Sequence, residues 1–242
     1  MAGNPRPRGV PGSTFSYEKG SVLDAEENRE LEFKSLVNAP SCSLRWKIME
    51  KAKKFICACL NAARNGIIYF GVGDNQEKAS KYHHGEIIGL DVEHMKDDIT
   101  KAFQCVLDDH IKSDAGPLQK GGEQNCVNIY FVPVKSQGTR SDAYVIEIEV
   151  ARDWRFCKDR VYYSKSWSEK RGTDREVGGK KALNDYFKVK DEWDDVAIRT
   201  NGSSTCVKPL EVASQVKKPL EAKYKDSKRM SGQGNDNLLL TK

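Results

Sequence analysis

An acidic stretch near the N-terminus, DAEENRELEFK, holds the side chains best suited to chemistry. In an extended chain successive side chains point to opposite faces, so we expect Glu32 and Lys34 on one face and Phe33 buried on the other. Glu27 lies upstream, and a further carboxylate, Asp74, follows an apolar run. Carboxylates bind hard Mg²⁺ or Mn²⁺, the metal activates water, and lysine steadies phosphate charge. The pattern suits metal-dependent phosphodiester cleavage, although a charged run before a helix is more often a solvated lead-in.

A basic segment follows. From Arg45 to Lys54 there are five basic side chains against the one carboxylate of Glu50, so ten residues carry a net charge of +4. At about 100° per residue of helix, Lys47, Lys51 and Lys54 fall on one stripe beside the buried face. Such a stripe is either an ordinary solvated helix face or a surface for phosphates, whose contacts are sequence-independent and salt-sensitive. The candidate nucleic-acid contacts here are Arg45, Lys47, Lys51 and Lys54.

Other residues leave alternatives open. Trp46 lies among the basic residues and could stack on a base or shield the helix edge. His83 and His84 could be ligands or a proton shuttle, yet adjacent loop histidines usually are neither. The basic segment 168–181 could extend the phosphate footprint or be a surface loop. The glycines of GVG at 71–73 lack the third glycine of a dinucleotide fingerprint and also fail the P-loop pattern.

Length and composition limit the class of protein. The 242 residues suffice for one sizeable globular domain. The longest apolar stretch, Ile67–Val72, is far shorter than the roughly 18 residues of a membrane-spanning helix. The N-terminal MAGNPRPRGVPG has no apolar run, so it is not a secretory signal, and seven cysteines without regular spacing indicate mostly buried thiols. We therefore expect a soluble, cytoplasmic protein without a membrane partner.

The positive charge is concentrated outside the central part of the chain. Of the net +5, residues 1–19 contribute +2 and residues 208–242 contribute +4, which leaves −1 for the remainder. Overall charge therefore does not indicate a nucleic-acid partner, and only a local basic surface can.

Apolar spacing predicts the elements that must position these side chains. A helix is expected over 44–60, with Ser43 as its N-cap and its end at Asn65-Gly66. The other expected elements are a buried strand over 66–74 with its partner over 86–92, a helix over 93–111, an antiparallel pair over 125–135 and 142–150, a short strand over 160–164, a short helix over 182–193 and a marginal helix over 209–230 broken at Pro219. This order predicts an α/β or α+β fold in which helices pack a mixed, largely antiparallel sheet.

Composition also suggests domain boundaries. Residues 1–21, rich in Pro, Gly and Arg, are expected to form a disordered lead. Residues 22–200 form the expected folded domain, and 201–242 read as a polar, basic tail.

Three motifs together resemble a known family. They are ENRELEFK, FICACLNAARNGIIYFGVGDN and HHGEIIGL. The first gives E-x4-E-F-K, the second A-C-x-N and F-G-V-x-D, and the third G-x-I-x-G. This combination resembles the Schlafen-type Alba (AlbA_2) domain from about Glu27 to Val161, and within that superfamily it is most similar to antiviral proteins of the sterile-alpha-motif nine and nine-like type.

The resemblance implies a nucleic-acid-binding domain with endoribonuclease activity on transfer RNA, in antiviral defence that inhibits translation. Carried over by position, the three-carboxylate site falls on Glu27, Glu32 and Asp74, which would hold Mg²⁺ or Mn²⁺. The nucleic-acid contacts of the antiviral relatives fall on Lys34, Lys47 and Lys54.

The chain departs from the Schlafen pattern in two ways. His83, His84, Cys126 and Cys157 do not match the zinc pattern of Schlafens. Schlafens also clamp RNA between two lobes, whereas this chain has one. We therefore weigh two functions, a nuclease and a non-catalytic module that binds transfer RNA or double-stranded DNA or RNA. A second copy or other domains of a larger chain would be partners.

Overall fold

The longest paired strands of the chain are β7 (Val127–Ser136) and β8 (Thr139–Val150). Both are rich in β-branched and aromatic residues that alternate with polar ones, which favours a pleated, half-buried strand. Gln137 and Gly138 connect them with φ of 51° and 75°. Positive φ at both central residues is the type I′ geometry that matches the twist of a hairpin. The predicted antiparallel pair is confirmed, with a shorter turn than expected. The computed structural model describes residues 15–74, 81–157, 160–165, 167–169, 187–189, 196–199, 203–207 and 212–232.

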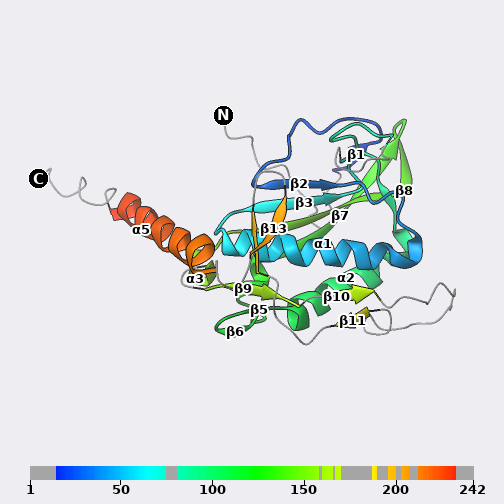
Figure 1. Cartoon of the computed structure of the whole chain (residues 1–242). Helices are drawn as coiled ribbons and strands as arrows, with labels where there is room; N and C mark the ends of the chain where they lie inside the picture. The colour runs from blue at the N-terminus through cyan, green and yellow to red at the C-terminus, as the bar shows by residue number, and fades with distance from the viewer. Residues whose placement is uncertain are drawn as a thin grey trace, which may run out of the picture.

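A mixed sheet is built around this hairpin, in the order β1-β7-β8-β3-β2, and β4 also pairs with β8 (Figure 1). Two pairs are parallel, β1 with β7 and β2 with β3, and the others are antiparallel. The added strands are β1 (Tyr17–Glu18), β2 (Leu31–Lys34), β3 (Gly66–Phe70) and β4 (Leu90–Asp91). The prediction of a mixed, largely antiparallel sheet packed by helices is confirmed.

The long helix α1 (Ser41–Asn61) covers one face of the sheet (Figure 1). Its apolar residues share a core with Ile68 and Phe70 of β3, while the alternate residues Ile67 and Tyr69 belong to a second core on the opposite face. The predicted helix is confirmed within a few residues at each end. The predicted N-cap is wrong, because the helix begins two residues before Ser43, whose hydroxyl donates to the carbonyl of Pro40 over 3.1 Å.

The remaining elements extend this framework. A second helical segment joins η1 (Glu93–Met95), α2 (Lys96–Cys105) and η2 (Val106–His110), close to the predicted 93–111. The others are β5 (Ile111–Ser113), β6 (Gly116–Pro117), η3 (Glu123–Cys126), α3 (Trp154–Cys157), β9 (Tyr162–Ser164), β10 (Trp167–Glu169), β11 (Phe187–Val189), β12 (Val196–Arg199), β13 (Ser204–Val207), η5 (Ala213–Lys217) and α5 (Lys218–Gly232). Strands β6, β5 and β9 form one small sheet, and β10 with β11 and β12 with β13 form two antiparallel pairs.

Several expectations need correction. The lead is shorter than 1–21, because β1 at 17–18 pairs with β7. Within the expected partner strand 86–92, only β4 is a strand, and Ile87 makes an isolated bridge with Val72. The helix expected over 182–193 is contradicted at β11.

Further corrections concern the second half of the chain. In the expected loop 168–181, Ser168 and Glu169 belong to β10, and residues 170–181 lie outside the described residues. The helix near 209–230 is present, and the π-helical turn η5 passes directly into α5 at Lys218, so the helix changes type next to Pro219 without ending there. The proposed boundary at 200 falls between the paired strands β12 and β13.

Two other expectations concern membranes and thiols. Among the described helices, none is both long and apolar enough to cross a bilayer. Of the six cysteines described, Cys57, Cys59, Cys126 and Cys157 are buried, as expected.

A buried histidine gives a prediction for pH dependence. His110 is 3% exposed, and burial, then Lys165 and Lys53, lower its pKa from 6.5 to about 4. Below pH 6.5 this imidazole takes up a proton in the unfolded chain, whereas in the folded chain it stays neutral down to about pH 4. The contribution of the neutral His110 to the free energy of unfolding is therefore fully present above pH 6.5 and is lost as the pH falls toward 4. We expect the free energy of unfolding to fall by about 3 kcal/mol from this group. Urea unfolding followed by circular dichroism should show a shallower pH dependence in His110→Gln, and equal slopes in both proteins would contradict the prediction.

Candidate active site

Strand β2 and the turn after β3 bring the acidic residues together. Parallel register places Lys34 opposite Phe70, the last residue of β3. The Lys34 carbonyl accepts from the N–H of Gly71 over 2.9 Å, so the chain leaving β3 stays beside the end of β2. Gly71 has φ of 87°, and a Cβ there would lie 3.1 Å from the Gly89 backbone, so this turn requires glycine. Asp74 consequently lies next to Lys34.

The ammonium of Lys34 lies among the three predicted carboxylates. Its Nζ donates to Asp74 Oδ2 over 2.8 Å and lies 3.6 Å from Glu32 Oε1 and 3.9 Å from Glu27 Oε1. Burial alone would lower the pKa of Lys34, but Glu32, Asp74 and Glu27 together raise it above its ordinary value. Sequence analysis expected Lys34 on a nucleic-acid-binding surface, and the structure places it within the carboxylate cluster.

Glu27 reaches the cluster from a turn before β2. The side chain of Asn28 accepts from the N–H groups of Glu30 and Leu31 over 2.7 and 3.0 Å, which fixes this turn. Glu27 Oε1 accepts from the Phe33 N–H over 2.6 Å. Burial raises the pKa of Glu27, and the Phe33 N–H and Lys34 oppose that effect.

Glu32 is held by a residue that sequence analysis missed. Its Oε2 accepts from Arg199 of β12, whose side chain is fully buried. The same guanidinium donates to the carbonyl of Asn28 over 2.8 Å and to the Ser204 hydroxyl over 3.1 Å. It also lies 4.8 Å from the centre of the Phe55 ring on α1. Arg199 thus ties β12 to both β2 and α1, and Glu32, expected on the face opposite buried Phe33, is itself buried in an ion pair.

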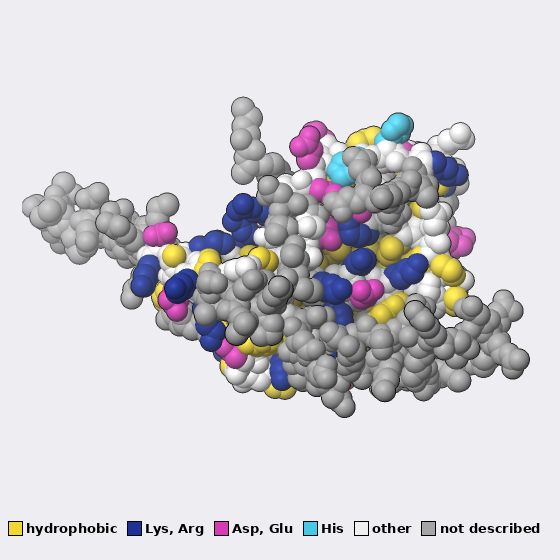
Figure 2. Space-filling model, viewed as in Figure 1, with side chains coloured by type: hydrophobic (Ala, Val, Ile, Leu, Met, Phe, Trp, Pro, Cys, Tyr) yellow, Lys and Arg dark blue, Asp and Glu magenta, His cyan; other side chains and the backbone are white. Residues whose placement is uncertain are grey.

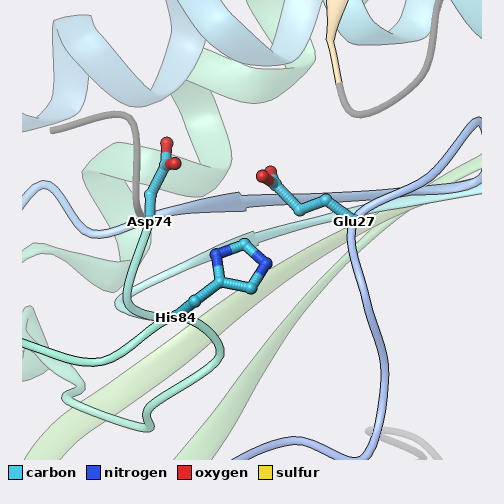
Figure 3. A group of neighbouring side chains, drawn as sticks. All are labelled: Glu27, Asp74 and His84. Atoms are coloured by element: carbon cyan, nitrogen blue, oxygen red, sulfur yellow. The ribbon is translucent and has the colours of Figure 1, made fainter.

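His84 joins the cluster from the other side (Figure 3). Ligand atoms of Glu27, Asp74 and His84 all lie within 4.8 Å of one another, which among the described residues makes them a candidate metal-binding group. The predicted set held Glu32 in place of His84. Two backbone bonds bring this loop here: the N–H of Gly85 donates to the Gly73 carbonyl over 2.9 Å, and the N–H of Gly73 donates to the Glu86 carbonyl over 2.8 Å. His83 is exposed and lies outside this group. The sequence HHGE offers His84 as a possible ligand, but only the backbone pairing in the structure shows that His84 lies close to Glu27 and Asp74.

The basic residues of α1 lie near the cluster and not within it. Lys51 is exposed, and Arg45, Lys47 and Lys54 are partly exposed. Figure 2 shows Lys and Arg side chains gathered over this helix. Lys54 pairs with Glu50 over 3.2 Å, a solvent-exposed contact that contributes little stability.

Two neighbours of this surface are buried instead of exposed. Trp46 is 7% exposed, which supports its role in shielding the helix edge over base stacking. Lys53 is 1% exposed, and its ammonium donates to the Lys165 carbonyl. The phosphate-facing candidates are therefore Arg45, Lys47, Lys51 and Lys54.

The Glu32–Arg199 pair gives a prediction for stability. Arg199→Ala leaves the buried Glu32 carboxylate with Lys34, at 3.6 Å, as its remaining cation, and we expect the free energy of unfolding to fall by about 3 kcal/mol. The double variant Arg199→Ala with Glu32→Gln removes that charge and should recover part of the loss. Urea unfolding measures both.

The matched control is Arg155→Ala, which removes an exposed arginine paired with Asp153 and should change little. A single variant no less stable than the double variant would contradict the role of charge compensation.

The part of the chain that contains this site is similar to known proteins. Residues 27–205 match the family model described as "Schlafen, AlbA_2". The mouse sterile alpha motif domain-containing protein 9-like is 28% identical over 182 residues, which cover 65% of this chain and 10% of the relative. Its human counterpart is 30% identical over 144 residues, 54% of this chain and 8% of the relative. The chain thus spans at most a tenth of these relatives. It belongs to the Schlafen AlbA_2 family.

Proposed function

We propose that this chain binds nucleic acid along α1 and cleaves RNA at the carboxylate cluster, as a divalent-metal-dependent endoribonuclease acting on transfer RNA. The observation that carries the proposal is the convergence of Glu27, Glu32 and Asp74 on Lys34, close to a basic helix. The family resemblance supports the same assignment. It also implies a cytoplasmic role in antiviral inhibition of translation, which we include in the proposal.

The donor set suits a divalent cation. Glu27, Asp74 and His84 offer two carboxylates and one imidazole within 4.8 Å. Carboxylates favour Mg²⁺ and Mn²⁺, and an imidazole ligand shifts the preference toward the softer Mn²⁺. These three residues would hold the ion. When bound, it would lower the pKa of a water molecule and neutralise charge on phosphate oxygens.

The chain's own residues would orient the substrate. Lys34 would stabilise the charge that develops on the phosphate, because its ammonium already lies within 4 Å of all three carboxylates. Glu32 would be kept in one orientation by Arg199. Arg45, Lys47, Lys51 and Lys54 would hold backbone phosphates, which position the strand without reading its sequence.

A specific observation favours a second candidate, the non-catalytic binding module. Lys34 already donates to Asp74, and Arg199 already donates to Glu32, so two of the carboxylates have protein cations as partners. Carboxylates arranged in this way could serve the fold alone. The two functions share a binding surface and differ in what the carboxylates do.

Asp74→Asn separates the two functions. We incubate the chain with labelled transfer RNA and with a labelled DNA duplex, with Mn²⁺ or with chelator, and read shift and cleavage on gels. The nuclease predicts RNA fragments only with metal, their loss by at least about 100-fold in Asp74→Asn, and a retained shift. Shifts of both ligands without fragments from the unchanged chain would support the binding module instead.

Charge reversal on α1 tests the shared surface. The double variant Lys47→Glu with Lys54→Glu should weaken the affinity for both ligands by about tenfold or more at 0.1 M salt, because two phosphate contacts are lost. Lys101→Glu with Lys120→Glu makes the same charge change at exposed sites on other elements. Affinity equal to that of this control would contradict nucleic-acid binding through α1.

A further inference from the structure

Four basic residues from four separate segments gather at the C-terminal end of α1. They come from the turn before β2, the residues after α1, the segment after β8 and helix α5, and they are Arg29, Arg64, Arg152 and Lys223. None of the four stands out in the sequence as a binding residue, because they are up to 194 positions apart and form no basic run.

Backbone and side-chain contacts fix this arrangement. Lys223 Nζ donates to the Ala62 carbonyl at the end of α1 over 2.6 Å. The N–H of Arg152 donates to the Asn65 side chain over 2.7 Å. The Arg29 carbonyl accepts from buried Arg199 over 3.2 Å.

The three arginines lie close enough to act electrostatically on Lys223. Burial lowers the pKa of Lys223, and Arg64, Arg152 and Arg29 lower it further. A folded surface that gathers like charges raises the local positive potential, and a bound polyanion relieves the repulsion. Arginine in particular suits phosphate, since its planar guanidinium can donate two parallel hydrogen bonds.

The cluster lies on the far side of the carboxylates from Arg45 and Lys47. Arg199 contacts both Glu32 and the Phe55 ring, so Glu32 lies beside the second half of α1, level with Lys54. Lys47 lies toward one end of the helix, and Arg64 lies beyond the other. The 14 residues from Lys47 to the end of the helix at Asn61 span about 21 Å at 1.5 Å per residue, the length of several nucleotides. In Figure 2 Lys and Arg side chains lie over α1, and further ones lie at its left end.

We propose that Arg29, Arg64, Arg152 and Lys223 form a second nucleic-acid-binding surface, which holds backbone phosphates on the side of the carboxylate cluster opposite the basic residues in the first half of α1. A strand held at both ends of α1 lies across Glu27, Glu32 and Asp74. This inference rests on the proposed function and adds to it the direction in which the strand crosses the site.

Neutralising two of the arginines tests the surface. Arg64→Gln with Arg152→Gln removes two charges and leaves Lys223, which docks α5 on α1. Fluorescence anisotropy with labelled transfer RNA and a labelled DNA duplex, in chelator, gives the affinity at several salt concentrations. We expect about tenfold weaker binding at 0.1 M salt and a slope of log affinity against log salt that is smaller by about 1.5. Arg64→Lys with Arg152→Lys keeps the charge and should keep most of the affinity and the slope.

The control and the α1 variant separate the two proposals. Lys101→Gln with Lys120→Gln removes the same charge from exposed positions elsewhere. If Lys47→Glu with Lys54→Glu weakens binding but the arginine variant matches this control, the second surface is overturned and the proposed function stands. If the unchanged chain binds neither probe, both are overturned. Thermal unfolding of each variant verifies folding. If the double glutamine variant unfolds, the single variants Arg64→Gln and Arg152→Gln keep the test decisive, since each should weaken binding by about threefold.

Discussion

The cost of keeping three carboxylates close together and largely out of water is the constraint on which this fold depends. Each carboxylate loses hydration and repels the others, so the cluster is stable only with compensating cations. Lys34 supplies one cation from within β2, and Arg199 supplies the other from β12. The three acids and two bases leave one net negative charge near His84, an arrangement that suits a cation.

This constraint explains why remote segments meet. The turn before β2, the turn after β3, the loop around His84 and the β12–β13 pair each contribute one partner to the same small volume. The sheet and α1 provide the rigid support, since Phe33 and Phe55 are fully buried and flank the cluster from both cores. The buried ion pairs of the cluster therefore help to fix the relative positions of these segments, in addition to hydrophobic packing.

Sequence reasoning succeeded where one element carries the whole signal. The alternation of side chains in a strand correctly predicted that Phe33 is buried and that Glu32 and Lys34 share the other face. Helical periodicity correctly predicted the position of α1. It failed where partners come from distant segments with weak patterns. Arg199 ends the apolar run 196–198, which is too short to indicate its partner strand, and His84 is brought to Asp74 by backbone bonds of Gly73 with Gly85 and Glu86. The buried Lys53, read as part of a basic run, shows that composition cannot reveal which lysine finds a carbonyl partner.

The Glu32–Arg199 contact also bears on the order in which the molecule can be completed. The two residues are 167 positions apart, so during synthesis from the N-terminus β2 and α1 emerge long before the guanidinium that compensates Glu32. Until β12 has left the ribosome, Lys34 is the cation available to this carboxylate, and Arg199 cannot yet tie β2 to α1. The carboxylate cluster is therefore completed late in folding, and a segment that contains its full set of charge partners must include β12.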